Sequence, residues 1–423
     1  MEPVKVLYAS FQMFSKVSGL EANMEKSSVY FGGVNQTLQL DILDQLGFLK
    51  GELPIRYLGV PLSTKRLSIT QCKPLIDKII GRITSWTSKF LSYAGRLQLI
   101  KSVVFSIQTF WSQIFTLPKK LIQMIESVCK RFLRTGGVDV SHRALIAWDR
   151  ICMPKVAGGM NIMDIQLWNK AAVCKLLWNI CNKKDKLWVK WIHCYYGRRA
   201  SMWKSKPMQA SWIVQKILKA AEYLEKVGIQ EEEFSQMQSF TIQKMYKKFQ
   251  GEYPKCSWKR LICNNYGAPR WLFILYLNLH GRLLTRDRIA KWSQIDDLSC
   301  PMCAREPESA EHLFFKCEAT SQIWESLLEW QGVQRKAKGW NEEVQWAEMH
   351  AKGKSANSNV YKICLAACVY HIWNERNLRI FQGKARQAKV IIRAIAQEIH
   401  SFGSKYKKLD NKLQEMKEYP KFR

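Results

Sequence analysis

The feature that most constrains the 423-residue sequence is a group of four residues with metal-ligand spacing. They follow the pattern C-x2-C-x8-H-x4-C and are Cys300, Cys303, His312 and Cys317. Two thiolates separated by two residues can share one tight turn and point at the same ion, and the His and the third Cys can complete a tetrahedron. Three thiolates and an imidazole select Zn²⁺ over Mg²⁺ or Ca²⁺. Because four protein ligands leave no open position, the pattern predicts a structural zinc that orders a segment too short to fold on its own core.

Other candidate sites are weaker. A sequence with 13 cysteines contains an isolated C-x2-C pair by chance quite often, so coincidence is the alternative to the zinc site. The pair Asp296-Asp297 has no apolar strand leading into it, as a two-metal catalytic site would need. Gly353-Lys354-Ser355 resembles the end of a phosphate-binding loop, but Glu348 occupies the position of the required glycine. From the residues alone, we therefore expect no active site.

The net charge indicates the class of partner. The sequence has 66 Lys and Arg against 35 Asp and Glu, a formal charge of +31. Such a surplus favours nucleic acid, because each neutralised phosphate releases counterions. The alternative is a basic protein whose charge only keeps it in solution. Tryptophans interleaved with lysine, as in residues 188–191 (WVKW), can stack on bases, although a tryptophan at helical spacing more often belongs to a core.

The sequence contains no membrane signal. Its longest mostly apolar stretch, 360–373, is interrupted by Lys362 and His371 and is too short and polar to span a bilayer. Residues 1–11 have neither the basic start nor the apolar run of a signal peptide. The scattered cysteines fit reduced thiols. We therefore expect a nuclear or cytoplasmic protein without a membrane partner.

Apolar periodicity predicts a mainly α-helical fold. Helices are expected before Gly19, over 71–86, over 90–115, after Pro118 and over 164–182. A short strand is expected at 28–31, closed by two glycines, whereas residues 34–54 have no clear period. From Lys405 onward, the chain is expected to fray into solvent.

The predicted helices carry basic residues on their polar faces, so the middle of the chain is expected to form a basic helical bundle. Such a bundle would contact nucleic acid mainly through phosphates. The candidate nucleic-acid-binding residues are Lys89, Arg96, Lys101, Lys130, Arg131, Arg282 and Arg286.

Several motifs in order give the sequence a family resemblance. They are Phe14–Leu20 (FSKVSGL), Tyr57–Leu62 (YLGVPL), Leu91–Arg96 (LSYAGR), Gly158–Ile162 (GGMNI), Leu279–Thr285 (LHGRLLT) and Tyr370–Asn377 (YHIWNERN). With these motifs and the Cys/His spacing, the chain resembles the C-terminal part of plant LINE-type (non-LTR) retrotransposon reverse transcriptases. The stretch 271–324 looks like the zinc-binding domain of that family.

The resemblance implies a domain order. The fold would be a helical thumb-like bundle with a short N-terminal palm-edge strand and a small zinc-binding domain. The implied segments are 1–54, a remnant of the polymerase palm edge; 55–200, a basic helical thumb-like region; 201–265, a helical connector; 266–331, the reverse-transcriptase zinc-binding domain; and 332–423, a basic helical C-terminal region.

The departures from the family decide the expected activity. The family's polymerase site needs an Asp motif and a Tyr/Phe-x-Asp-Asp hairpin, and both would lie upstream of Phe11, where the sequence has no Asp. We therefore expect no catalytic residue and no enzyme activity from this chain, but a zinc-containing fragment that binds RNA or DNA. One alternative is part of an RNA-directed DNA polymerase that works only with a complementing palm. Another is a zinc-stabilised scaffold or pseudogene product without activity.

Overall fold

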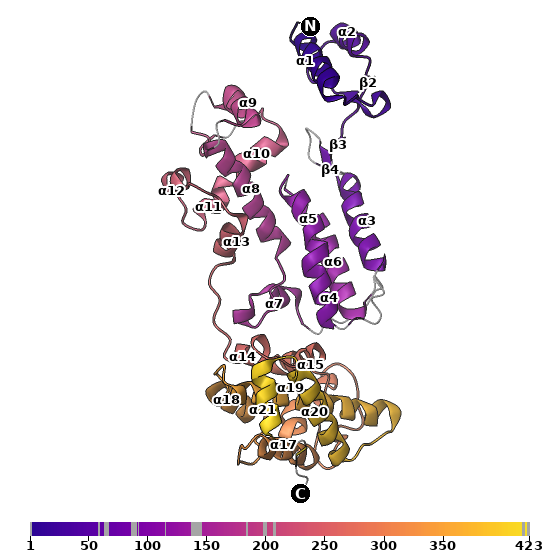
Figure 1. The fold of residues 1–423 in the computed structure, drawn as a ribbon, viewed down its shortest axis with the longest axis vertical. Coiled ribbons are helices and arrows are strands. Elements are labelled where there is room, and N and C mark those ends of the chain that lie inside the picture. Colours follow the sequence, from indigo (N-terminus) through magenta and orange to yellow (C-terminus); the bar gives the residue numbers. More distant parts are fainter. Residues whose placement is uncertain are drawn as a thin grey trace. The chain divides into compact units, whose positions relative to one another are not determined.

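A computed structural model describes residues 2–57, 60–62, 67–85, 91, 93–114, 116–136, 146–182, 185–197, 201–205, 209–416 and 419–420. Within them the protein is mainly α-helical, which confirms the predicted fold class, and it has two small β-sheets (Figure 1). Among these residues, no helix combines the length and the apolar character needed to cross a membrane. The chain forms two compact units, each assembled from three stretches of sequence.

The first unit comprises Met1–Lys78, Thr109–Ile122 and Asn169–Met245. Its own elements are α1 (Glu2–Ser18), η1 (Met24–Lys26), β1 (Ser28–Val29), α2 (Gln36–Leu46), β2 (Leu49–Lys50), β3 (Ile55–Tyr57), β4 (Val60–Leu62), α9 (Leu187–Tyr196), α10 (Trp212–Leu218), α11 (Ala221–Glu225) and α12 (Glu231–Gln236). Strands β1 and β2 pair in parallel, and β3 and β4 form an antiparallel pair with Tyr57 opposite Val60. The predicted N-terminal strand is therefore present, but only two residues long.

The second unit comprises Ile79–Gln108, Gln123–Trp168 and Tyr246–Arg423. Its elements are α4 (Tyr93–Leu99), η3 (Ile100–Val104), α7 (Trp148–Cys152), η4 (Lys155–Ala157), α14 (Lys259–Cys263), α15 (Pro269–Leu279), α16 (Arg286–Ile289), η5 (His312–Lys316), α17 (Glu318–Trp330), α18 (Trp340–His350), α19 (Ala356–Gln382), α20 (Ala388–Gly403) and α21 (Lys407–Glu415). Five helices contribute residues to both units: α3 (Ile69–Ser85), α5 (Phe105–Ser112), α6 (Lys119–Thr135), α8 (Ile165–Asn182) and α13 (Ile242–Gln250).

The strongly periodic stretches form the predicted helices. Helices α3, α6 and α8 match the predictions at 71–86, after Pro118 and at 164–182. The stretch predicted as one helix over 90–115 contains α4, the π-helical turn η3 and α5. The wider π turn buries both Ile100 and Val104 completely, so the apolar stripe stays on the core side.

Helix α2 lies in the region where the sequence shows no period. It begins at Asn35, whose side chain accepts a hydrogen bond from the Leu38 N–H, and it ends at Gly47 in the left-handed conformation. Ile42 is its one buried residue. The helix is therefore defined by its two end residues and not by an apolar stripe.

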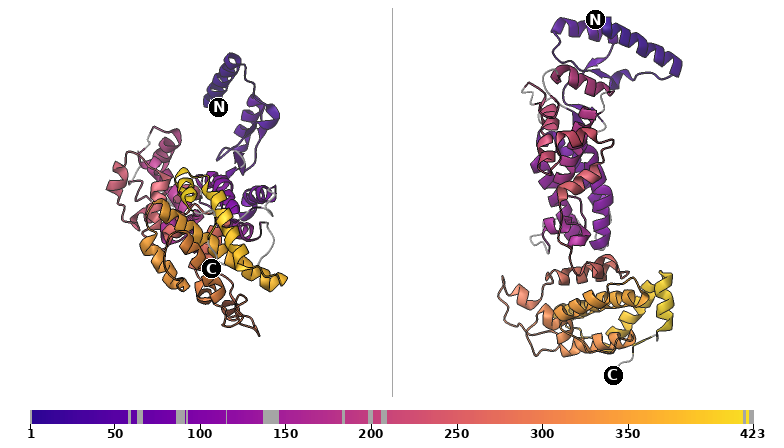
Figure 2. Two further views of the ribbon diagram at one scale, coloured as in Figure 1. Left: turned by 60° about the horizontal axis from the view of Figure 1, so that its bottom comes forward. Right: turned by 90° about the vertical axis from the view of Figure 1, so that its left-hand side faces the viewer.

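The last part of the second unit packs around α19. This 27-residue helix contacts α15, α17, α20 and α21, and Figure 2 shows it lying among them. Trp271 of α15 and Trp324 of α17 are fully buried. The segments 266–331 and 332–423 therefore contribute side chains to one core.

The expectation that the chain frays from Lys405 onward is wrong for residues 407–415. These residues form α21, and Leu409 and Leu413 are 2% and 1% exposed. The two leucines are one helical turn apart and face α19 and α20, so their burial offsets the polarity of the remaining residues.

Candidate metal centre

A short hairpin positions the first two cysteines. Ser299 and Pro307 form a β-bridge, and the Cys300 N–H donates to the Glu306 carbonyl at 2.7 Å. The chain then turns tightly, since the Ala304 N–H donates to the Cys300 carbonyl at 2.8 Å and Ala304 has a φ of +56°. We name residues 298–308 the Cys loop. Its turn places Cys300 and Cys303 on the same side.

A second turn positions the other two residues. The Cys317 N–H donates to the His312 carbonyl at 2.8 Å, which closes η5. Inside it, Phe315 has a φ of +83°, and its buried ring stacks on Trp324 with centroids 5.1 Å apart. Packing therefore holds a backbone conformation that non-glycine residues seldom adopt. Cys317 follows this turn and occupies the N-cap position of α17.

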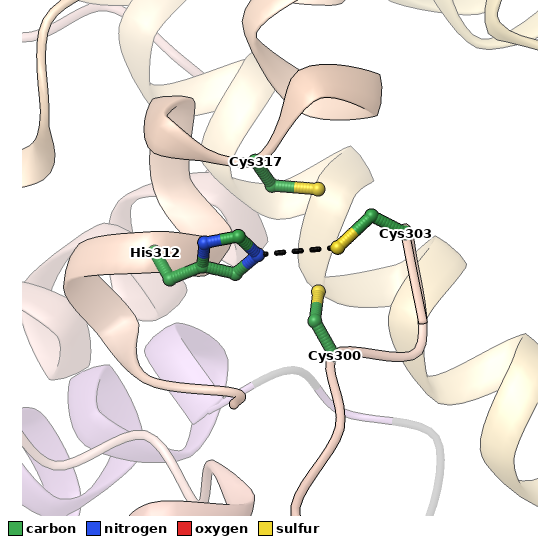
Figure 3. Close-up of side chains that lie close together, drawn as sticks. All are labelled: Cys300, Cys303, His312 and Cys317. Carbon is green, nitrogen blue, oxygen red and sulfur yellow. Dashed lines mark hydrogen bonds between the residues drawn. The ribbon is translucent and has the colours of Figure 1, made fainter. Parts of the chain in front are cut away.

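The four side chains converge on one point. One ligand atom from each of Cys300, Cys303, His312 and Cys317 lies within 4.8 Å of the other three. Figure 3 shows the four side chains pointing toward one another. The Cys303 Sγ and His312 Nε2 are 3.3 Å apart. Tetrahedral zinc with ordinary bond lengths would place a sulfur and a nitrogen ligand about 3.6 Å apart, so the donor set fits the ion. The structure thus brings together all four residues of the predicted ligand set.

Burial and charge suit a metal ligand set. Cys300 and Cys317 are fully buried and His312 is 6% exposed. A hydrogen bond between the thiols of Cys300 and Cys317 lowers the pKa of Cys317 and raises the pKa of Cys300, and burial raises the latter further. Thiols are deprotonated when they bind a metal, so a bound cation would replace the proton that these two sulfur atoms share.

A carboxylate from the Cys loop lies beside His312. Its Nδ1 lies 3.0 Å from the Glu306 Oε2, at an angle outside hydrogen-bond geometry. A carboxylate behind the non-coordinating nitrogen is typical of metal-bound histidines, because it favours the tautomer that leaves Nε2 free for the ion. Glu306 therefore lies next to the site, although it donates no ligand atom.

Helix α19 holds the Cys loop through Arg379. The Nη1 of this residue donates to the carbonyl groups of Pro301 and Met302 at 3.3 and 3.1 Å, and these are the two residues between the first cysteines. The Nε donates to Glu375 at 3.0 Å. Glu375 is fully buried and also accepts from Arg386. The loop between the two cysteines is thus fixed by a helix that follows the ligands in sequence.

A second arginine of α19 anchors the other end of the loop. Arg376 donates from Nε and Nη2 to the two carboxylate oxygens of Glu308, at 2.7 and 2.8 Å. Glu308 is fully buried and Arg376 is 3% exposed. The same carboxylate accepts from the Arg286 N–H at 2.8 Å. Removing one member of such a pair would leave an uncompensated buried charge.

The candidate nucleic-acid-binding residues are less exposed than the sequence suggests. Arg96 donates to the Arg134 carbonyl at 2.9 Å, and the Lys101 Nζ donates to the Met160 carbonyl. Arg286 forms an ion pair with Asp297.

The remaining candidates are partly exposed or lie outside the described residues. The Nζ of Lys130 lies 3.7 Å from the Oε2 of Glu126, and 44% of the Lys130 side chain is exposed. Arg131 and Arg282 are half-buried, and Lys89 lies outside the described residues.

Sequence reasoning missed the arginines and glutamates that support the site. Glu308, Glu375 and Arg379 carry no spacing signal that links them to the cysteines. Glu375 and Arg376 lie inside the motif Tyr370–Asn377, and Arg379 follows it one helical turn after Glu375, so a helical reading extended past the motif could have found the Glu375–Arg379 pair. Within the residues that the structure describes, no second group of three or more Cys, His, Asp or Glu side chains is arranged to hold a metal ion.

Comparison with known proteins agrees with this geometry. Residues 240–324 match a family described as zinc-binding in reverse transcriptase, and they include all four converging residues. A protein of Arabidopsis thaliana that carries the name of a ribonuclease H protein is 26% identical over 129 residues, which are 30% of this chain and 21% of that protein. The chain thus matches about a fifth of the length of this relative. Residues 240–324 are therefore similar to the zinc-binding segment of reverse transcriptases.

Proposed function

We propose that this chain is a zinc-containing, nucleic-acid-binding C-terminal region of a plant LINE-type retrotransposon reverse transcriptase. The convergence of three cysteines and one histidine, within a segment that matches the reverse-transcriptase zinc-binding family, carries the proposal. The LINE assignment rests on the ordered motifs of the sequence, and the plant assignment on the same motifs and the Arabidopsis relative.

The zinc would have a structural role. Cys300, Cys303, His312 and Cys317 would hold it and fill its coordination, leaving no position for a substrate. The ion would fix the Cys loop against η5, and the arginines of α19 would then fix that loop to the rest of the unit. All 13 cysteines are free, as thiolate ligands require, and this suits a nuclear or cytoplasmic protein.

Binding would act mainly on the phosphate backbone. The formal charge of +31 supports this, because contacts between Lys or Arg and phosphate release counterions whatever the sequence of the nucleic acid. Exposed Lys130 and half-buried Arg131 and Arg282 remain candidates for such contacts, and so does Lys89. Affinity should therefore depend steeply on salt and little on base sequence.

The test combines metal analysis with a salt titration. Zinc per chain is measured by mass spectrometry, and the affinity for a structured RNA and a duplex DNA is measured between about 50 and 200 mM salt, with and without a zinc chelator. We expect one zinc per chain, a steep loss of affinity with salt, and weaker binding after chelation. A chain that binds no zinc, or an affinity that does not change with salt, would contradict the proposal.

A catalytic role is the second candidate, and the motif Phe14–Leu20, which resembles the segment after the family's catalytic hairpin, favours it. In that case the chain would be the part of an RNA-directed DNA polymerase that needs a separate palm. Primer extension with Mg²⁺ tests this directly, and cleavage of an RNA–DNA hybrid tests the activity named for the Arabidopsis relative. Nucleotide incorporation by the chain alone would show that binding is not its whole function.

A further inference from the structure

Helix α9 has two opposite faces. Val189 and Ile192 are buried, which fixes the inward face. The outward face carries Trp188, Trp191 and Tyr195, which are 37%, 49% and 66% exposed, together with Leu187 at 84%. At 100° per residue Leu187, Trp191 and Tyr195 share one stripe on the solvent side of the helix, and Trp188 lies at its border with the buried face. The rings of Trp191 and Tyr195 are neighbours, with centroids 4.8 Å apart.

Lysines border this aromatic stripe. Lys190 within the helix and Lys186 at its N-cap position are both exposed, and helical geometry places Lys190 next to Leu187 on the edge of the stripe. Within the described part of the chain, neither lysine forms an ion pair. The surrounding sequence 183–199 (KKDKLWVKWIHCYYGRR) contains six basic residues and one acidic residue. Exposed aromatic rings and positive charges thus lie next to each other on α9, and the helix itself contains no Asp or Glu.

We infer that the outward face of α9 is a stacking platform for single-stranded nucleic acid. Every base has a π face, so exposed rings bind unpaired bases without reading their sequence, while adjacent lysines contact the phosphates. A protein partner is the other occupant of an exposed apolar face, but a strongly basic border with aromatic rather than aliphatic residues favours a polyanion whose bases can stack. This inference rests on the proposed nucleic-acid function. It specifies that the bound nucleic acid is single-stranded and that α9 is the surface that binds it.

The experiment uses the full chain and a labelled single strand of roughly 16 nucleotides, with affinity measured by fluorescence anisotropy. The test variant is Trp191→Ala with Tyr195→Ala. The matched control is Tyr266→Ala with Tyr406→Ala, which removes a second pair of exposed neighbouring rings, 43% and 42% exposed with centroids 4.5 Å apart. A third variant, Trp191→Phe with Tyr195→Phe, keeps two rings on α9 and reports whether stacking is the cause.

The expected result is a loss of affinity of about tenfold to hundredfold for the α9 alanine variant, with wild-type affinity for the control and most of the affinity kept by the phenylalanine variant. Circular dichroism should show the same helix content in all three, since the replaced rings face solvent.

Unchanged affinity in the α9 alanine variant overturns the inference, and so does an equal loss in the control. Unchanged single-strand binding with an altered oligomeric state would assign the face to protein contact instead. If the wild-type chain itself binds no nucleic acid, the proposed function fails and not only this inference.

Discussion

The metal centre and helix α9 use the same residue types in opposite ways. Around the metal centre, Arg376 and Arg379 point inward to a buried carboxylate and to backbone carbonyl groups, and Trp324 is fully buried. On α9, Lys190 and Trp191 face solvent. The net charge therefore does not locate a binding surface. What matters is whether a charge is already paired within the fold, and near the metal centre it largely is.

The largest effect is expected from removing one of the four candidate ligands of the metal centre. Structural zinc contributes about 10–16 kcal/mol in zinc-finger peptides, so its loss should unfold a segment that depends on it. We expect Cys303→Ser to reduce zinc from about one per chain to nearly none. Hydrogen exchange should then show loss of protection in the Cys loop and η5, while α8 and α9 keep theirs. Full zinc retention in this variant would contradict the ligand set.

The next effect tests the buried ion pair. Arg376→Ala should destabilise the C-terminal part of the chain by about 3–5 kcal/mol, because it leaves the buried Glu308 carboxyl group without its partner. Urea unfolding, followed by hydrogen exchange of α19, measures it. The double replacement Glu308→Leu with Arg376→Met is the control, since it removes both charges. If the double variant loses as much stability as the single one, the loss of packing and not the unpaired charge explains the effect.

A smaller effect is expected at the arginine that holds the Cys loop. Arg379→Ala should weaken zinc binding about 10- to 100-fold, as removal of residues behind metal ligands typically does. Competition with a chromophoric chelator gives the affinity. Lys389→Ala on α20 changes an exposed basic residue in the same region and should leave zinc affinity unchanged. Equal affinities for the Arg379 variant and the wild type would mean that the loop holds its shape without α19.

The smallest effect is expected at the exposed lysines of helix α9. Replacing Lys186 and Lys190 with Gln should reduce the slope of log K against log salt for a single strand by about 1.4, since each lost phosphate contact contributes about 0.7. Arg286→Gln should leave that slope unchanged, because its guanidinium is paired with Asp297. A larger slope change for Arg286 than for the lysines would reverse the distinction between paired and unpaired charge.

The sequence predicts what is encoded locally. Helices α3, α6 and α8 follow from apolar periodicity within each segment. The four converging residues also lie within one short stretch, 300–317, where a C-x2-C turn restricts the geometry by itself. In both cases the interacting residues are close in the chain, so spacing carries the information.

The features that were missed depend on partners far away in the sequence. Leu409 and Leu413 are buried by α19 and α20, and no local pattern in a polar segment shows that. The pairing of Arg376 with Glu308 likewise joins residues that only the fold brings together. Helix α2 was missed for a different reason, because its ends are well capped while its middle buries only Ile42.

The position of Cys317 at the start of α17 has an electrostatic consequence. A Zn²⁺ ion held by three thiolates and a neutral imidazole carries one net negative charge. The first turn of α17 would present the positive end of the helix dipole to that charge. Besides the Cys300 thiol, the N–H groups of Ala319 and Thr320 lower the pKa of Cys317. If zinc is bound, the helix would thus compensate the anionic complex from within the fold.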